Sequence, residues 1–310
     1  MFKEKSEKEI WKQLKKRSLE DIESIKAIED FFIKKRGYVF QMPKPKSPVI
    51  LLLSGGMDSI VLWDILVSKY QLNVYPVFVT EKRGIFRYLD NQYRSAEYFE
   101  RFYKKKFKSL FHPKIVVYIG DFLRDKILKF FLKNPIEILN NVYEDGNICV
   151  QNYSTTNLLA SAALDYIQLL KFQKNIEVKT IFIGNLVSDG EIVQNQTLTS
   201  LRSIMFNLCN ISGDYDKQFT SLFLEKELGY FLEKDSVIKW AQKESIPVTK
   251  TWTCWDRNGI LPCGSCIACE YRQNAMAQSG LKDVVYMNFI KDLLLTVSNK
   301  MSKLRRRLVS

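Results

Sequence analysis

The stretch from Pro48 to Ile60 constrains the fold more than any other part of this 310-residue sequence. Five consecutive apolar residues, 49–53, run directly into Ser-Gly-Gly-Met-Asp-Ser at 54–59. A short apolar run that ends in glycines is typical of a strand buried on both faces of a parallel sheet. Apolar residues then recur at helical spacing over 60–70. The sequence therefore predicts a glycine turn between a buried strand and a helix.

Such a turn is suited to bind a phosphate group. The first backbone N–H groups of a helix have no partner within it and carry the positive end of its dipole. Gly55 and Gly56 allow the backbone to approach an anion, while Ser54, Asp58 and Ser59 supply polar side chains. The spacing is not that of a Walker A loop, which needs Gly-Lys-Ser/Thr after four intervening residues. The alternative is an ordinary glycine turn without a ligand.

Strands and helices are expected to alternate along the rest of the chain. Further strands are predicted at 72–80, 114–119 and 179–184, with Pro76 suited to an edge strand or a strand start. Helices are predicted at 91–110, 122–133, 136–143, 156–172, 204–209, 218–226 and 236–243. The alternation predicts an α/β, Rossmann-like fold, a parallel sheet with helices on both faces and ligands at the carboxyl ends of its strands.

The two ends of the chain are basic and differ from the middle. Most of the formal net charge of +13 lies in residues 1–46 and 300–310. Patterns of the capping-box type at 6–9 and 18–21 predict two helices before residue 36, with an apolar stripe that packs on the main domain or on a partner protein. The basic ends are expected to be solvated; the alternative is a tether for nucleic acid or an acidic protein.

The cysteine content and the hydropathy predict a cytoplasmic location without a membrane anchor. Six cysteines are too few and too clustered for a disulfide scaffold. Residues 1–17 are rich in Lys and Glu and contain no apolar signal-peptide core. No apolar run approaches the length of a membrane span.

Four cysteines within sixteen residues form the second constellation: Cys254, Cys263, Cys266 and Cys269. This spacing predicts a tetrahedral zinc site, because closely spaced thiolates can wrap one ion. Four cysteine ligands leave zinc no open position, so the metal would be structural. An iron–sulfur cluster is the main alternative, since four cysteines serve both kinds of site.

The remaining cysteines and the single histidine carry less information. Cys149 and Cys209 are expected in the core rather than as nucleophiles. His112 precedes Pro113 and is expected in a turn. The scarcity of histidine argues against a Ser-His-Asp hydrolase, whereas an ATP-dependent acyl activation needs only N–H groups, cations and Mg²⁺.

The two constellations together resemble one known family. The Ser-Gly-Gly-x-Asp-Ser segment resembles the pyrophosphate loop of the N-type ATP pyrophosphatases, which have the adenine nucleotide alpha hydrolase-like fold. With Thr-Trp-Thr-Cys-Trp at 251–255 and Cys-Gly-Ser-Cys-Ile-Ala-Cys-Glu-Tyr-Arg at 263–272, the chain resembles the 7-cyano-7-deazaguanine synthase (QueC) family. The resemblance runs from about Val49 to Asp283.

The resemblance implies a two-step use of ATP and a set of cofactors and partners. The carboxylate of 7-carboxy-7-deazaguanine would be adenylated with release of pyrophosphate, and ammonia would give the amide and then the nitrile. ATP, Mg²⁺ and a structural Zn²⁺ would be bound. The expected partners are the small-molecule substrate, a second copy in a homodimer and a protein bound through the N-terminal helices; nucleic acid is not expected as a substrate.

The resemblance also implies roles for individual side chains. The ATP site would comprise Ser54, Gly55, Gly56, Asp58 and Ser59. The catalytic residues would be Asp58, Ser59 and Lys234. The substrate-binding residues would be Gln92, Asn157 and Asp189. Lys234 has an alternative interpretation as a surface cation near a helix start.

Departures from the family pattern keep other functions open. Thr156-Asn157 stands where the family has an Arg-Asn pair, so a guanidinium that would hold an anion is missing. This change and the terminal extensions favour a QueC-like protein of bacterial anti-phage operons, in which a protein amine is the acceptor. A non-catalytic nucleotide-binding subunit is a third hypothesis. An RNA-modifying thiolase is a fourth, and would need Cys149 or Cys209 as a reactive cysteine.

Four domains or segments are expected from these features. They are a basic helical extension with a proline linker at 1–46, an ATP pyrophosphatase domain at 47–250, a Cys₄ zinc-binding segment at 251–285 and a basic helix or tail at 286–310.

Overall fold

The computed structural model describes residues 2, 4–80, 88–118, 155–281 and 283. Within this part of the chain five parallel strands form one sheet in the order β3-β2-β1-β4-β5. The strands are β1 (Pro48–Leu52), β2 (Asn73–Thr80), β3 (Ile115–Tyr118), β4 (Thr180–Phe182) and β5 (Gln218–Thr220). The first four confirm the strands predicted from the sequence.

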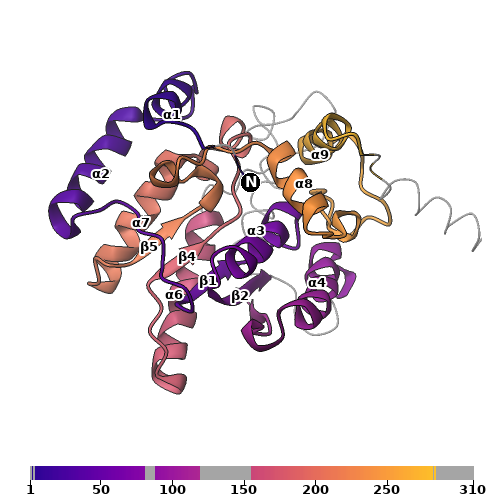
Figure 1. The fold of residues 1–310 in the computed structure, drawn as a ribbon, viewed down its shortest axis with the longest axis horizontal. Coiled ribbons are helices and arrows are strands. Elements are labelled where there is room, and N and C mark those ends of the chain that lie inside the picture. The colour runs from indigo at the N-terminus through magenta and orange to yellow at the C-terminus, as the bar shows by residue number, and fades with distance from the viewer. Residues whose placement is uncertain (1, 3, 81–87, 119–154, 282, 284–310) are drawn as a thin grey trace, which may run out of the picture.

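Helices cover both faces of this sheet (Figure 1). The α-helices are α1 (Glu7–Leu14), α2 (Ile22–Arg36), α3 (Met57–Ser68), α4 (Asn91–Phe107), α6 (Thr155–Lys174), α7 (Leu198–Ser212), α8 (Lys234–Lys243) and α9 (Ile267–Gln278). The short 3₁₀ helices are η2 (Lys108–Leu110), η5 (Asp189–Glu191), η6 (Gln194–Gln196), η7 (Leu222–Leu224), η8 (Lys226–Leu228) and η9 (Val248–Lys250).

The side chains of β1 show why both faces are covered. Val49 and Leu51 join a core cluster with α3, α4, α8 and α9, whereas Ile50 and Leu52 join a second cluster with α1, α2, α6 and α7. All four are buried, because successive strand residues point to opposite faces and each face meets a layer of helices. The predicted α/β fold with a parallel sheet is confirmed.

The N-terminal helices pack on the rest of this chain. Ser6 and Glu9 form the predicted capping box at α1, whereas Asp21, not a residue nearer Ser18, caps α2. The apolar stripe of these helices is buried in the core cluster around α6 and α7. The stripe is therefore covered by the chain itself.

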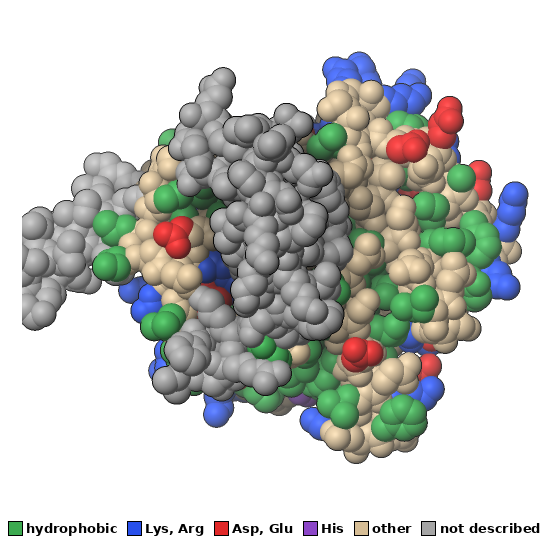
Figure 2. Space-filling model, turned by 180° about the vertical axis from the view of Figure 1, so that it is seen from behind, with side chains coloured by type: hydrophobic (Ala, Val, Ile, Leu, Met, Phe, Trp, Pro, Cys, Tyr) green, Lys and Arg blue, Asp and Glu red, His purple; other side chains and the backbone are tan. Residues whose placement is uncertain are grey.

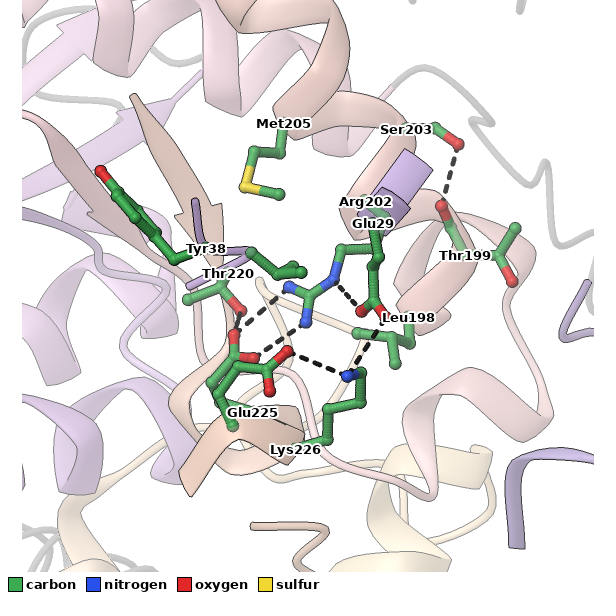
Figure 3. A network of polar contacts seen from close by, with 12 residues as sticks. Glu29, Tyr38, Leu198, Thr199, Arg202, Ser203, Met205, Thr220, Glu225 and Lys226 are labelled. Atoms are coloured by element: carbon green, nitrogen blue, oxygen red, sulfur yellow. Dashed lines mark hydrogen bonds and ion pairs between the residues drawn. The ribbon is translucent and has the colours of Figure 1, made fainter. Parts of the chain in front are cut away.

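A buried ionic network fixes α2 to α7 (Figure 3). The fully buried guanidinium of Arg202 donates to Glu29 at 3.0 Å and to Glu225 at 2.8 Å. Thr220 donates to the other oxygen of Glu225 at 2.6 Å, and Lys226 lies 3.2 Å from Glu29. Both carboxylates raise the pKa of Arg202 despite its burial. The network therefore joins α2 to α7 and to the segment after β5.

The helix predicted at 218–226 is wrong. Residues 218–220 form β5, and the 3₁₀ helices η7 and η8 follow. Phe219 is buried in the core cluster beneath α7, while the side chain of Gln218 donates to Thr180 Oγ1 of β4 and to the carbonyl of Gln41. Pairing with β4 therefore decides the conformation of three residues whose own pattern is too short to indicate a strand.

Pro76 was expected at an edge or a strand start, and this expectation is wrong, because β2 lies between β1 and β3. The carbonyl of Val77 accepts from Leu53 after β1, so the backbone of the preceding residue, Pro76, faces β3. The ladder with β3 begins only at Val77, which pairs with Ile115. The missing N–H of Pro76 therefore costs no hydrogen bond in the sheet.

Other expectations have mixed outcomes. The predicted helices at 122–133 and 136–143, Cys149 and the tail at 286–310 lie outside the described residues. Cys209 is buried in the core, as predicted, and burial raises the pKa of its thiol to about 11. His112 stacks on Tyr75 with ring centroids 4.1 Å apart. No helix in the described ranges is long and apolar enough to cross a membrane.

Candidate functional site

The predicted phosphate loop joins β1 to α3 at the carboxyl end of the sheet. Gly55 has a φ of +75°, and a Cβ built there would lie 2.0 Å from the carbonyl oxygen of Gln92. Only glycine fits at this position. Gly56 is the N-cap of α3 and places no side-chain acceptor on its first N–H groups. The start of the helix therefore has no side-chain cap, and the phosphate predicted to bind there stays a prediction.

Two serines hold the shape of this loop. Ser59 Oγ lies 3.0 Å from Ser54 Oγ, accepts from the Ser54 N–H and donates to the Gly56 carbonyl. Gly184, which follows β4, faces the loop from the neighbouring strand, and a Cβ there would lie 2.8 Å from the Ser59 nitrogen. The ends of β1 and β4 therefore meet at the loop, where the parallel topology predicts a ligand site.

Three charged residues from distant parts of the chain meet beside the loop. Lys234, the first residue of α8, lies 3.2 Å from Asp58 in the first turn of α3. Asp189 follows β4 and accepts from the N–H of Leu186 at 2.8 Å. Asp189 lies close enough to both other residues for each charge to act on its titration. The structure thus brings together three of the side chains predicted from the sequence.

The charges of this trio follow from burial and mutual attraction. Burial raises the pKa of Asp189 to about 6, and the negative charge of Asp58 adds to this, while Lys234 opposes it. Burial alone would lower the pKa of Lys234, but the two carboxylates raise it. Lys234 is therefore a buried, permanently charged ammonium, and its interpretation as a surface cation is wrong.

Two buried oxygen atoms, one on a member of the trio and one on the residue before Asp189, have no hydrogen-bond partner among the described residues. They are Oδ1 of Asp58 and Oγ of Ser188. Carboxylate and hydroxyl oxygens suit Mg²⁺, which also keeps several waters. Asp58 was predicted as an ATP-site residue, whereas Ser188 was not. The one feature of the sequence that could have indicated a role for Ser188 is its position after β4, immediately before Asp189.

The other two residues predicted to bind substrate are placed less fully. Gln92 lies in the first turn of α4, and its carbonyl oxygen faces Gly55. Asn157 is exposed in the first turn of α6, next to the buried Thr156. No contact among the described residues ties the Asn157 side chain to the trio, so its role stays a prediction.

The four clustered cysteines form a candidate metal site. Their Sγ atoms all lie within 4.8 Å of one another. The Sγ atoms of Cys254 and Cys263 are 3.5 Å apart, and two further pairs are 4.0 Å apart. Four thiolates around one zinc ion at about 2.3 Å would be about 3.8 Å apart. The N–H of Cys263 also donates to Cys254 Sγ, and the N–H of Cys266 to Cys263 Sγ. The site therefore fits a single ion.

The cysteine segment is attached directly to the phosphate loop. The carbonyl oxygen of Gly55 accepts from the N–H of Trp252 at 3.1 Å and from Ser95 Oγ of α4 at 2.7 Å. Arg272 of α9 is buried and donates to the hydroxyls of Thr251 and Thr253 at 2.8 and 3.0 Å. These contacts hold the segment before Cys254 against the loop.

A cavity of about 290 Å³ lies elsewhere, at the opposite end of the sheet. It is lined by Lys46 before β1, by the last residues of α3 and by the last residues of α4. Because it lies at the amino ends of the strands, it is not part of the site described above.

The family models match one part of the chain. The model described as "Queuosine biosynthesis protein QueC" matches residues 170–280, which include Asp189, Lys234 and the four cysteines. This segment is therefore similar to QueC proteins. The resemblance to QueC proteins predicted from the sequence is thereby confirmed.

Curated relatives bear the same family name. A 7-cyano-7-deazaguanine synthase of Prochlorococcus marinus (strain MIT 9515) is 29% identical over 126 residues, which cover 34% of this chain and 54% of that protein. The synthase of P. marinus (strain NATL2A) is 34% identical over 56 residues, covering 18% of this chain and 24% of that protein. The chain thus spans about half the length of the first of these QueC relatives and less of the other.

Among solved structures the likeness is weak. The U34-tRNA thiolase NcsA from Methanococcus maripaludis, with its 4Fe–4S cluster, is 14% identical and has a TM-score of 0.32, covering 87% of this chain and 80% of that chain. The NH3-dependent NAD synthetase from Campylobacter jejuni is 14% identical and has a TM-score of 0.28, covering 83% and 94%.

Replacing Cys266 by Ser is expected to remove about one equivalent of bound metal and to unfold the segment around α9, because binding of the ion and folding are linked. Metal analysis of the purified protein and its thermal unfolding measure both effects. Cys209→Ala, a buried cysteine outside the cluster, should keep the metal. A full equivalent in Cys266→Ser would contradict the site, and iron in the parent protein would favour the iron–sulfur alternative over zinc.

Proposed function

We propose that the chain is an ATP-dependent, QueC-like enzyme that activates the carboxylate of a 7-deazaguanine acid with release of pyrophosphate and transfers the acyl group to nitrogen. The match of residues 170–280 to the QueC family model and the names of the relatives support this proposal. A loop shaped for phosphate at the carboxyl end of the sheet supports it independently.

One observation carries the proposal. Lys234 and Asp189 belong to the segment that matches QueC proteins, and they meet Asp58 of the Ser-Gly-Gly-x-Asp-Ser loop, which precedes that segment. A buried ammonium beside the open start of α3 can neutralise phosphate charge where water is excluded. A non-catalytic subunit would have no use for a buried charge trio at the loop.

The first half of the proposed reaction has two steps, and each forms one bond and breaks another. A carboxylate oxygen of the acid attacks the α-phosphorus of ATP, and the bond to the β-phosphate oxygen breaks with release of pyrophosphate. The nitrogen of ammonia then attacks the acyl carbon, AMP leaves with the electron pair of the C–O bond, and a proton is lost to give the amide. The amide oxygen then attacks the α-phosphorus of a second ATP with release of a second pyrophosphate, and loss of AMP and of both amide protons gives the nitrile.

The residues of this chain take separate roles in these steps. The N–H groups at the start of α3 would bind the departing pyrophosphate, with Ser54 and Ser59 holding the loop in shape. Lys234 would balance the charge that develops on the phosphate oxygens. Asp58 Oδ1 and Ser188 Oγ would hold Mg²⁺, which lowers the charge of the triphosphate. Zn²⁺ on the four cysteines would be structural.

The acceptor distinguishes this proposal from the anti-phage alternative, in which a protein amine takes the acyl group. The buried Thr156 in place of the family arginine favours a changed acceptor site. A docked protein would have to use the exposed faces of α1 and α2, since their apolar stripe is buried. A homodimer remains part of the proposal and can be measured by analytical ultracentrifugation.

Nucleic acid is not proposed as a substrate, despite the net charge of +13. On the face shown in Figure 2, the Lys and Arg side chains of the described residues are scattered around the outline and do not gather in one patch. Most of the excess positive charge lies in residues 1–46 and 300–310, outside the segment that matches QueC proteins.

The test is to incubate the protein with ATP, Mg²⁺ and 7-carboxy-7-deazaguanine, with and without ammonia, and to follow products by mass spectrometry and pyrophosphate by a coupled assay. Pyrophosphate release that depends on the acid, with the mass of the amide or nitrile, is the expected result. Pyrophosphate or an adenylate without either product would favour the protein-amine acceptor. Failure to release pyrophosphate with this acid would contradict the proposed substrate.

A further inference from the structure

Arg17 connects the N-terminal extension to the two segments that carry Asp189 and Lys234. It lies in the turn between α1 and α2, and its side chain is only 12% exposed. Its guanidinium donates to the carbonyl of Val187 at 2.8 Å and lies 2.9 Å from Glu191 Oε1. It also lies 3.6 Å from Glu233 Oε1. One side chain thus contacts the segment after β4 and the N-cap of α8.

The residues that Arg17 contacts are close neighbours of Asp189 and Lys234 in the sequence. Val187 and Glu191 lie two residues on either side of Asp189, and Glu233 immediately precedes Lys234. The two segments are also joined directly, since the N–H of Val187 donates to the carbonyl of Leu232 at 3.2 Å. The guanidinium therefore lies where it can set the distance between the Asp189 loop and the start of α8.

The turn that carries Arg17 is itself held in place. Glu20 accepts from the N–H groups of Leu198 and Thr199, both at 2.9 Å, at the start of α7. Gln194 donates to the carbonyl of Leu19, and the N–H of Asp21 donates to Thr199 Oγ1. The turn therefore packs along the chain that follows Asp189 as far as α7, and it presents Arg17 from a fixed backbone.

The charges around Arg17 explain why a cation is needed there. Glu191 and Glu233 place two further carboxylates next to Asp189 and Lys234 in the sequence, and Lys234 is already engaged with Asp58. Without Arg17, Glu233 would lose a cation that now offsets its negative charge, and this charge acts on Asp189. The family match begins at residue 170, so Arg17 lies outside it.

We infer that Arg17 is a positioning residue of the reaction site, supplied by the N-terminal extension, which holds Asp189 and Lys234 against Asp58. The inference rests on the proposed function for its role in turnover. It makes the extension a part of the enzyme's reaction site rather than only a support for the sheet.

The test compares three variants in the pyrophosphate assay with ATP and 7-carboxy-7-deazaguanine. Arg17→Ala is expected to lower kcat about tenfold, because small displacements of reacting groups are costly, with the KM for ATP within about twofold since the phosphate loop is untouched. Arg17→Lys should recover most of the rate, because an ammonium still pairs with the carboxylates. Equal rates for Arg17→Ala and the parent protein would overturn the inference.

Arg36→Ala is the matched control. Arg36 also belongs to the extension and also donates to backbone carbonyls, those of Tyr215 and Lys217 at 2.7 and 2.8 Å, but it does so before β5, at the amino end of the sheet. Its loss should lower the midpoint of thermal unfolding and leave kcat within about twofold of the parent value. A loss of kcat equal to that of Arg17→Ala would show a general effect of stability and overturn the inference.

Amide hydrogen exchange without substrate separates this inference from the proposed function. In Arg17→Ala, exchange of the peptide covering 186–191 should quicken, whereas in Arg36→Ala it should not. If the parent protein releases no pyrophosphate, the proposed substrate fails, and the exchange result still decides whether Arg17 fixes the loop. Unchanged exchange in Arg17→Ala would reject the positioning role.

Discussion

Replacing Asp58 by Asn is expected to lower the rate of pyrophosphate release by about a hundredfold or more, the range found when one preorganised electrostatic group is removed. The amide keeps the shape of the side chain but removes the charge that faces Lys234 and would hold Mg²⁺. Initial rates in the coupled pyrophosphate assay measure the effect. Circular dichroism should show an unchanged fold, since Asp189 remains to balance the buried ammonium.

Asp235→Asn provides the matched control for this prediction. Asp235 is the neighbour of Lys234 on α8, but its carboxylate pairs with Lys239 one turn on, at 2.8 Å, and not with the loop. The same chemical change there should leave the rate within about twofold, because the group touches none of the reacting atoms. A normal rate in Asp58→Asn, or an equal loss in Asp235→Asn, would refute the assignment of Asp58.

Replacing Arg202 by Leu is expected to lower the free energy of unfolding by about 3–5 kcal/mol, the cost of breaking a buried ion pair from one side. The change leaves the buried carboxylate of Glu29 with Lys226 and that of Glu225 with the hydroxyl of Thr220 but no cation in contact (Figure 3). Urea unfolding followed by far-UV circular dichroism measures the loss. If the variant does not fold, Arg202→Lys, which keeps the charge and loses the two-pronged geometry, should give an intermediate loss.

An exposed ion pair just before β4 and β5 provides a comparison for the contribution of burial to the free energy of unfolding. Lys179 and Asp216 lie 2.7 Å apart, with side chains about half exposed. Lys179→Ala should change the free energy of unfolding by no more than about 1 kcal/mol, because exposed pairs are solvated and screened. Similar losses in the two variants would contradict the view that α2 is fixed to α7 by the buried network.

The parts of the fold that the sequence predicts best are those with a strong local signal. The apolar run before Ser54 and the glycine pair predict β1, the loop and α3, because strand, turn and helix follow one another within twenty residues. Close spacing likewise predicts the four-cysteine site. The strand β5 was missed because three residues carry no periodicity, and only its pairing with β4 makes it a strand.

The contacts that complete the site depend on tertiary structure. Asp58 and Lys234 lie 176 residues apart, and nothing in either neighbourhood indicates that they pair. The contact of Arg17 with Val187 spans 170 residues. The sequence showed the extension as an amphipathic pair of helices and gave Arg17 no role, because charge on a turn between two helices is usually solvated.

The carbonyl oxygen of Gly55 links the phosphate loop to the cysteine cluster, although no cysteine lies in the loop. It accepts the N–H of Trp252, two residues before Cys254. Thiols only 3.5 Å apart, such as those of Cys254 and Cys263, are within easy reach of disulfide formation once a metal is lost. A disulfide there would shift the backbone that supports Gly55. Oxidation of this cysteine pair is therefore expected to weaken the phosphate binding proposed for the loop.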